Sequence, residues 1–591
     1  MNLKCFMSSY SSFSAKSRFK NKKELFCPSL IGCIHFCPIY GVDTNIQCPK
    51  TCKTVLYKGQ KMKKIPIKIA LIASPYPLSE FPSPPLGICY VAAACEKAGA
   101  EVQLFDYIIS EYSPEKLRQS LNEFQPDIVG ASSVTLNFPR TVDILKDVKK
   151  IHPHVITMMG GPHVSFDYEH ILRSIPEIDM VVRGESEKTL LSLIPVIKDR
   201  SQWAHIPGIA FCENNMLVTT KNQSFIENLD DIPLPARHLL NIPKYHTLGF
   251  PISIITSRGC PNRCIFCQGR RMVGQKVRYR SLEKVVDEIE YLMSLGFDLI
   301  NIADDLFTAN KKRVIRFCEL INKRQLSFVW SAFSRVNTVD PEILSRMKSA
   351  GCYAISFGIE SGNPAMLKRI QKGITLNQAR YAAQCSKEAG IRTHASFMVG
   401  LPGETHDSLN DTLQFAESLD IEYGFHFLAP FPGTTLREKI DEYDLEILSN
   451  DWEKYDANQA IVRTSALSPE DIETFVANWS KEQNDIWEKQ LKAFEKGDHL
   501  DHSEKANVEE YHKRRFIFWL LSQDLIEKMG KFHYQNDHLF ESLCQRISAH
   551  VSKKEPLMDE AFVQKHLKSL IDKQFIQCEK LENEYVWKWH K

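Results

Sequence analysis

Three cysteines, Cys260, Cys264 and Cys267, lie within eight residues of one another. Cysteine thiolates are ligands for zinc ions and for iron–sulfur clusters. A structural zinc site needs a fourth ligand, for which His246 upstream and Cys318 downstream, in a predicted helix, are the candidates. A four-iron cluster held by three cysteines keeps one open iron position, which can bind and activate a small molecule. The spacing therefore favours a cluster, with zinc as the alternative.

Small and charged residues follow the other strands that we predict in this region. Chemistry in a βα barrel gathers at the carboxyl ends of the strands, so these residues are candidates for cofactor binding. Less specific interpretations stay open: the aspartates fit a solvated turn, the arginine a surface ion pair, and Glu404 a helix cap. The candidates are Asp304, Asp305, Arg335, Glu360 and Gly400.

A regular alternation of strands and helices over residues 246–445 would position these side chains. One helix is expected after Ser281, with its apolar residues on one face and a stop at Gly296. Six βα units predict a partial (β/α)6 TIM-like barrel, not the closed eight. The predicted strands are 252–257, 299–303, 328–333, 353–359, 393–399 and 425–428.

Residues 65–200 predict a separate α/β domain. Five short apolar runs alternate with helical segments, which is the pattern of a doubly wound, Rossmann-like parallel sheet. No GxGxxG follows the first strand, and this argues against a dinucleotide-binding domain. The predicted strands are 67–73, 101–105, 128–131, 155–159 and 180–182.

The ligands of such a sheet bind beyond the carboxyl ends of its strands. Small residues there let a large planar ligand approach the backbone closely, although the glycine pair at 160–161 also fits a plain tight turn. We expect cofactor contacts from Ser132, Ser133, Gly160, Gly161, Gly184 and Glu185.

The remaining segments carry no motif that identifies a ligand. Residues 201–245 are expected to be a linker, and residues 450–591 a helical C-terminal domain that begins with Ser468 as cap and Pro469 in the first turn. Residues 1–61 contain six of the 17 Cys, and ten Lys and Arg against two Asp and Glu. We expect the working protein to begin at Met62, with residues 1–61 an upstream extension outside the fold; a secretion signal and a metal site are the alternatives.

Composition and charge limit the class of protein. The 591 residues are 43% hydrophobic and 25% charged, as in globular proteins, and no apolar run reaches the length of a membrane span. Scattered cysteines are typical of a reducing cytosol, so we expect a cytoplasmic protein. Beyond residue 61, acidic residues exceed basic ones by six, which argues against general nucleic-acid binding.

The cysteine loop resembles that of the radical S-adenosylmethionine (SAM) superfamily. The shared features are the Cys-x3-Cys-x2-Cys spacing after a first barrel strand and the aromatic Phe266 before the last cysteine. The preceding domain resembles the cobalamin-binding domain of one subgroup, which includes methyltransferases and enzymes similar to anaerobic magnesium-protoporphyrin monomethyl ester cyclase. The resemblance covers residues 66–445, including the connector 229–237 and the segment 277–281.

The resemblance implies a set of cofactors and contacts. Cys260, Cys264 and Cys267 would hold a [4Fe-4S] cluster whose open iron chelates the amino and carboxylate groups of SAM. Asp304 or Asp305 would replace the Gly-Gly-Glu segment of the family, which this chain lacks. Glu360 would bind the ribose, Arg335 the carboxylate, and Gly400 the adenosyl group. Cobalamin would bind without a protein His ligand, because the loop 74–87 has no His and His163 is expected in a loop.

The resemblance also implies a reaction. A reduced cluster would donate one electron to SAM, giving methionine and a 5′-deoxyadenosyl radical that abstracts hydrogen from an unreactive carbon of a small-molecule substrate. Cobalamin would deliver a methyl group or assist another outcome, and flavodoxin or ferredoxin would supply electrons. Two alternatives remain: a methylthiotransferase, disfavoured by the acidic body and by the lack of a second cysteine trio, and a non-catalytic cobalamin or cluster sensor.

Overall fold

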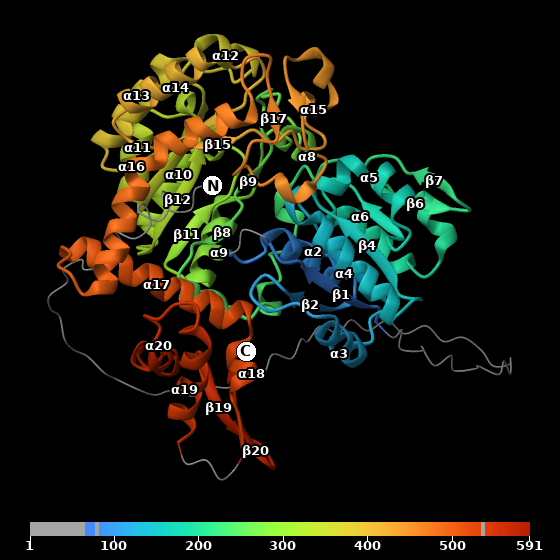
Figure 1. Cartoon of the computed structure of the whole chain (residues 1–591). Helices are drawn as coiled ribbons and strands as arrows, with labels where there is room; N and C mark the ends of the chain where they lie inside the picture. Colours follow the sequence, from blue (N-terminus) through green and yellow to red (C-terminus); the bar gives the residue numbers. More distant parts are fainter. Residues whose placement is uncertain (1–65, 77–81, 534–537, 591) are drawn as a thin grey trace, which may run out of the picture. The chain divides into compact units, whose positions relative to one another are not determined.

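The computed structural model describes residues 66–76, 82–533 and 538–590. The segment 1–61 lies outside these residues. Within them, a seven-stranded sheet, a six-stranded sheet and a three-stranded sheet follow one another along the chain (Figure 1). No helix in these ranges combines the length and apolar character needed to cross a membrane.

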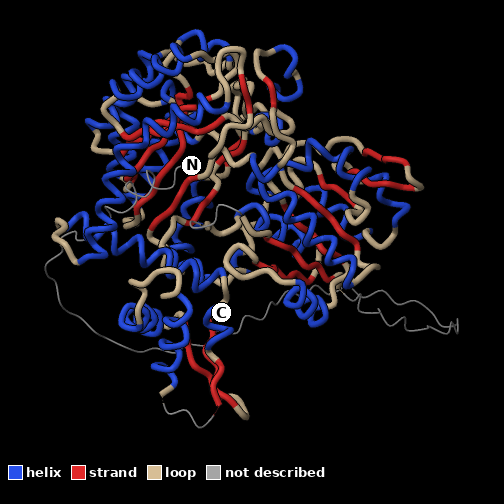
Figure 2. Tube along the Cα trace, viewed as in Figure 1, coloured by secondary structure: helices blue, strands red, loops and turns tan. Residues whose placement is uncertain are grey.

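The first sheet contains the five predicted parallel strands. Their order in the sheet is β2-β1-β3-β4-β5. Residues of β1 alternate between two cores, with Ile69 and Leu71 on one face and Ala70 and Ile72 on the other. Helices cover both faces (Figure 2), so the predicted doubly wound sheet is confirmed. The strands are β1 (Lys68–Ala73), β2 (Glu101–Asp106), β3 (Ile128–Ser132), β4 (Ile156–Gly160) and β5 (Met180–Val182), and the helices are α2 (Leu86–Lys97), α3 (Pro114–Phe124), α4 (Phe138–Ile151), α5 (Pro162–Ser174) and α6 (Glu187–Leu193).

The segment predicted as a linker instead extends this sheet. Strands β6 (Ile209–Glu213) and β7 (Met216–Thr219) form an antiparallel hairpin, and β6 pairs antiparallel with β5. The turn between them, Asn214-Asn215, has φ of 50° and 61°. Two consecutive left-handed residues are the geometry of a two-residue hairpin turn, for which Asn is a favoured residue. The prediction of a linker over 201–245 is therefore wrong at this hairpin.

The second sheet is the predicted partial barrel. Its six strands are all parallel, in the order β15-β14-β13-β12-β11-β8. Alternate residues of β14 are buried against the helices, as expected for strands with one face on a helical layer. The strands are β8 (Ile252–Ile254), β11 (Leu299–Ile302), β12 (Val329–Ser334), β13 (Cys352–Glu360), β14 (Arg392–Val399) and β15 (Glu422–Phe427), and the main helices are α9 (Leu282–Ser294), α10 (Lys311–Lys323), α11 (Pro341–Ser349), α13 (Leu376–Glu388) and α14 (His406–Ser418).

Two local details at the entrance to this barrel differ from expectation. The strand predicted over 252–257 ends at Ile254, and a separate short strand, β9 (Ser257–Arg258), follows. Ser281 occupies the N-cap position of α9 but makes no side-chain cap hydrogen bond. Its own backbone N–H donates instead to the Asp230 carboxylate at 3.0 Å, so the connector supplies an acceptor at this helix start.

The C-terminal region contains strands as well as helices. Ser468 caps α16 (Pro469–Lys496) through a reciprocal pair with Asp471, as predicted. The region is mainly helical, as predicted, and a three-stranded antiparallel sheet that was not expected accompanies the helices. The other elements are α17 (His502–Ser522), α18 (Leu525–Met529), α19 (Leu539–Val551), α20 (Glu560–Asp572), β18 (Lys531–His533), β19 (Ile576–Lys580) and β20 (Glu584–Trp589).

Candidate active site

The three cysteines lie on a loop closed by a short two-stranded neck. Strand β9 pairs antiparallel with β10 (Arg278–Tyr279), and the Cys260 N–H donates to the Gly274 carbonyl at 3.1 Å. Gly259 has φ of +108°, and a Cβ at this position would overlap the Lys276 carbonyl oxygen. Because both backbone segments are this close, glycine is required directly before the first cysteine.

Each of the three sulfurs accepts one hydrogen bond. The Asn262 amide donates to Cys260 Sγ at 3.2 Å, and the Gly269 N–H donates to Cys267 Sγ at 3.3 Å. The Arg335 guanidinium donates to Cys264 Sγ at 3.6 Å. Donors aimed at sulfur stabilise thiolates, the form in which cysteine binds metal, and hydrogen bonds to sulfur tune iron–sulfur clusters.

The sulfurs also influence one another electrostatically. Burial raises the pKa of Cys267, and the nearby Cys264 and Cys260 raise it further. A cationic metal centre would reverse this tendency and hold the thiolates. Among the residues the structure describes, no group of three or more His, Cys, Asp and Glu surrounds a point as the ligands of one metal ion would. Three thiolates on one loop are also a ligand set that a four-iron cluster could take, with each thiolate on a different iron.

The two aspartates after β11 have different surroundings. Asp304 is buried and accepts hydrogen bonds from the Thr256 N–H, the Thr256 hydroxyl and the Ser257 hydroxyl, each at 2.6 Å. It therefore holds the break between β8 and β9. Asp305 is exposed and accepts from the Gly259 N–H at 2.9 Å, beside the cysteine loop. Of the two candidates, Asp305 is the one whose place suits a SAM contact.

Arg335 and Glu360 are joined through a lysine that the sequence did not single out. Lys372 donates to Glu360 Oε1 at 2.7 Å, and its carbonyl oxygen accepts from Arg335. The Lys372 ammonium also lies 5.7 Å from the centre of the Phe266 ring. Glu360 has φ of +75°, a strained conformation of the kind found at functional sites.

Arg335 itself is a buried cation with spare donors. Its described partners are the Cys264 sulfur and the Lys372 carbonyl, and its Nε has no acceptor among the described residues. The alternative interpretation of Arg335 as a surface ion pair is therefore wrong, because this residue is only 7% exposed and neither partner is a carboxylate. An anionic ligand beside the cluster would satisfy this guanidinium, so the site fits the SAM carboxylate.

Other residues of the chain pack directly against the segment that follows β14. Gly400 has φ of +82°, and a Cβ there would lie 3.0 Å from a methyl of Val462. The space that the sequence assigned to the adenosyl group is thus occupied on this side. Glu404 is fully buried and accepts from the Gly400 N–H at 2.6 Å, so it supports this turn, whereas Thr405 caps α14. Burial raises the pKa of Glu404 to about 8.

In the first domain, two of the predicted strand-end residues pack on each other. A Cβ on Gly161, with φ of +107°, would overlap the Ser133 carbonyl oxygen, and the Ser133 N–H donates to the Gly160 carbonyl at 3.0 Å. Glycine is needed at position 161 because the backbones at the ends of β3 and β4 approach each other closely there. Ser132 is the last residue of β3, and Gly184, with φ of +71°, has no atom within 4 Å of a Cβ position.

Glu185 and His163 are placed differently from expectation. Both carboxylate oxygens of Glu185 pair with Arg278, so this residue anchors the neck of the cysteine loop and is not free for a cofactor. His163 lies buried inside α5, not in a loop, with its ring 4.2 Å from that of Phe138. Burial, with Arg437 and His170, lowers the pKa of His163 to about 3 and keeps the ring neutral.

A cavity of about 520 Å³ lies against the cysteine loop. Its wall includes Cys264 and Cys267 together with Phe166, which lies on α5 of the first domain. Sequence reasoning missed Phe166 and Lys372, because nothing in their local pattern shows what lies opposite them. Further lining residues are Asn222, Phe225, Arg263, Arg270, Arg271, Gly274, Gln275 and Thr435.

Comparison with protein families gives two matches along the chain. Residues 79–194 match the B12 binding domain, and residues 254–416 match the Radical SAM superfamily. Over 392 residues the chain is 35% identical to an uncharacterized methyltransferase of Pyrococcus horikoshii, covering 66% of this chain and 85% of that protein. It is 30% identical to the anaerobic magnesium-protoporphyrin IX monomethyl ester cyclase of Rubrivivax gelatinosus, covering 65% of this chain and 70% of that protein.

Solved structures share the fold. The methyltransferase TsrM from Kitasatospora setae, with cobalamin and a [4Fe-4S] cluster bound, matches with a TM-score of 0.60 at 18% identity, covering 76% of this chain and 99% of that one. The cobalamin-dependent SAM radical enzyme OxsB matches with a TM-score of 0.64 at 18% identity, covering 86% of this chain and 80% of that one. At these identities the likeness concerns architecture alone.

Proposed function

We propose that this chain, which belongs to the radical SAM superfamily and carries a B12-binding domain, modifies an unreactive carbon of a small-molecule substrate. Membership makes it an enzyme with a [4Fe-4S] cluster, SAM and cobalamin as cofactors. The observation that carries the proposal is the cysteine trio at the carboxyl end of β8, where each sulfur receives a hydrogen bond.

Different residues of the chain would bind different parts of these cofactors. Cys260, Cys264 and Cys267 would hold the cluster, which when reduced supplies the electron that breaks the sulfonium bond of SAM. Arg335 would bind the SAM carboxylate and Asp305 its ammonium group. Glu360, oriented by Lys372, would accept hydrogen bonds from the ribose hydroxyls.

We favour methyl transfer as the outcome, because the methyltransferase of Pyrococcus horikoshii is similar over most of its length. Ring closure is the second candidate, because the magnesium-protoporphyrin cyclase is also similar over more than two thirds of its length. We expect a flavodoxin or ferredoxin as electron donor. The acidic balance beyond residue 61 supports a small-molecule substrate over a nucleic acid.

The decisive experiment is anaerobic purification with cobalamin supplied, followed by reduction in the presence of SAM. We expect 5′-deoxyadenosine from the wild type and none from Cys264→Ala. A non-catalytic sensor would bind cluster and cobalamin but release no 5′-deoxyadenosine. Iron below about three atoms per chain after reconstitution would contradict the assignment of a four-iron cluster.

SAM labelled in its methyl group separates the two outcomes. Methyl transfer would move the label into a small-molecule product from an extract of the source cells, whereas cyclisation would leave the label in methionine. Label recovered in protein or RNA would favour a methylthiotransferase and overturn the proposed substrate class.

A further inference from the structure

The neck of the cysteine loop places two arginines opposite each other. Arg258 on β9 and Arg278 on β10 are paired in register in the two-stranded neck. Two guanidinium groups this close repel each other and need carboxylate partners. Those partners do not come from the barrel.

Both arginines are paired with carboxylates of the B12-binding domain. The guanidinium of Arg278 binds both oxygens of Glu185, at 2.8 Å and 2.6 Å. Arg258 binds Glu187 at 2.6 Å and lies 3.5 Å from Glu185. Glu185 and Glu187 stand between the end of β5 and the first turn of α6. Two cations and two anions therefore form one compensated network between this domain and the neck.

Arg278 also reaches into the cysteine loop itself. It donates to the carbonyl of Val273, inside the loop, at 2.5 Å, and to the carbonyl of Ile226, between β7 and the connector, at 2.6 Å. The Ile226 N–H in turn donates to Glu185 at 3.1 Å. One guanidinium thus ties together the first domain, the segment that leads into the connector and the loop that carries the three cysteines.

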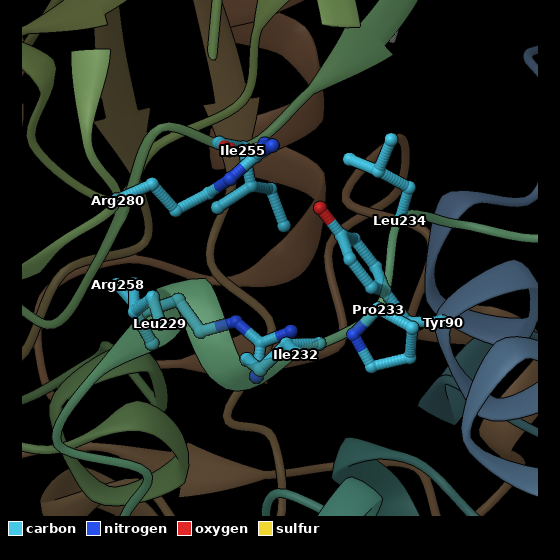
Figure 3. Close-up of a pocket in the computed structure, with 8 residues that line it drawn as sticks. All are labelled: Tyr90, Leu229, Ile232, Pro233, Leu234, Ile255, Arg258 and Arg280. Atoms are coloured by element: carbon cyan, nitrogen blue, oxygen red, sulfur yellow. Dashed lines mark hydrogen bonds between the residues drawn. The ribbon is translucent and has the colours of Figure 1, made fainter. Parts of the chain in front are cut away.

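The network is buried and its surroundings leave little free space. Arg258, Arg278, Glu185 and Glu187 are each at most 9% exposed. A cavity of about 10 Å³, room for roughly one water, lies beside Arg258 and is drawn in Figure 3. In that view Tyr90 from α2 faces the two arginines Arg258 and Arg280 across the cavity. A displacement on either side of such a packed contact is transmitted to the other.

We propose that Glu185 and Glu187 are positioning residues for the iron–sulfur cluster, so that the B12-binding domain holds the cysteine loop in its ligating geometry. Glu185 follows directly on Gly184, at the carboxyl end of β5 where ligands of this sheet bind. A ligand that reaches Gly184 would lie one residue away from the anchor of the loop, and its binding would stiffen the loop. The inference rests on the assignment of the cysteine trio as the cluster site.

The test compares reconstituted enzymes in the full chain, with and without hydroxocobalamin. The variants are Glu185→Gln, Glu187→Gln and the conservative Glu185→Asp. The control is Glu555→Gln, which breaks a partly buried pair with Arg515, 2.8 Å long, in the C-terminal region. Three quantities are measured: the thermal midpoint, the line shape of the electron paramagnetic resonance (EPR) spectrum of the reduced cluster, and the rate of iron loss to a ferrous chelator.

We expect Glu185→Gln to lose iron about tenfold faster than the wild type, with an altered spectrum, and Glu185→Asp to recover most of the difference. Hydroxocobalamin should slow iron loss in the wild type and not in Glu185→Gln. Glu555→Gln should lower the thermal midpoint and leave both cluster readouts unchanged. If Glu185→Gln does not fold, Glu187→Gln decides by the same readouts.

The positioning role would be overturned if Glu185→Gln and Glu187→Gln had the same EPR spectrum and the same rate of iron loss as the wild type. It would also be overturned if Glu555→Gln changed the spectrum and the iron loss as much as these two variants do. Iron loss in the wild type that hydroxocobalamin leaves unchanged would overturn the link to ligand binding. A wild type that takes up no cluster would contradict the proposed function itself, so the two failures are distinguishable.

Discussion

Replacing Arg335 with glutamine separates ligand binding from stability. The side chain is 7% exposed, and its described partners are a sulfur and a carbonyl, so its positive charge is not compensated by a described carboxylate. Removing an uncompensated buried charge does not weaken a fold, and it often strengthens it. We therefore expect Arg335→Gln to leave the thermal midpoint of the cluster-free protein unchanged or slightly higher.

The same substitution should weaken SAM binding strongly. A hydrogen bond to a charged group contributes about 1.5–3 kcal/mol, which corresponds to a rise of about 10- to 150-fold in Kd. The assay is a SAM titration of the reduced, reconstituted enzyme, followed by the EPR change of the cluster. Arg392→Gln is the control, since Arg392 pairs with Glu422 at 2.8 Å at the amino ends of the barrel strands.

The opposite pattern would refute this reasoning. A large fall in the thermal midpoint with unchanged SAM affinity would make Arg335 a structural residue that supports Cys264 and Lys372. Equal losses of SAM affinity in Arg335→Gln and Arg392→Gln would show that the effect is not local to the cluster.

Two further predictions concern stability. Burial raises the pKa of Glu404 to about 8 in the folded protein, above its unfolded value of 4.5, so its contribution to stability is full below pH 4.5 and is lost as pH rises to about 8. Glu404→Gln should remove this loss of stability with rising pH. Thermal midpoints that vary with pH identically in the wild type and in Glu404→Gln would contradict this prediction. In Gly161→Ala the added Cβ would overlap the Ser133 carbonyl at positive φ, so this substitution should lower the free energy of unfolding by about 1–3 kcal/mol in denaturant titrations. Gly87→Ala is the control, because Gly87 faces open space within α2, and it should raise the free energy of unfolding slightly. Equal effects of the two substitutions would argue against the close approach at Gly161.

Local patterns predicted the strands and the cysteine loop well, because both depend on short-range information. Alternation of apolar runs with helical segments specifies a parallel sheet, and three cysteines within one loop must lie close together whatever else the chain does. The hairpin of β6 and β7 was not predicted, because its turn signal, Asn214-Asn215, lies between strands that are too short to show a clear alternation of apolar and polar residues.

Side-chain roles that depend on distant partners could not be predicted. Asp304 is 48 residues from Thr256, and Glu185 is 93 residues from Arg278. A carboxylate at a strand end has the same local pattern whether it binds a cofactor or anchors a loop. Lys372 and Phe166 likewise acquire their place through residues that only the fold brings near them.

The C-terminal region shares one apolar core with the first domain, and this affects how the chain is made. Phe516 and Leu520 of α17 belong to the same core as Ile69 and Leu71 of β1, and Asp524 accepts a hydrogen bond from Ser110, 414 residues away. The first domain is therefore synthesised long before the C-terminal residues that complete this core. Until synthesis ends, the apolar residues that the C-terminal region covers stay exposed to water, so truncated or stalled chains should aggregate and depend on chaperones.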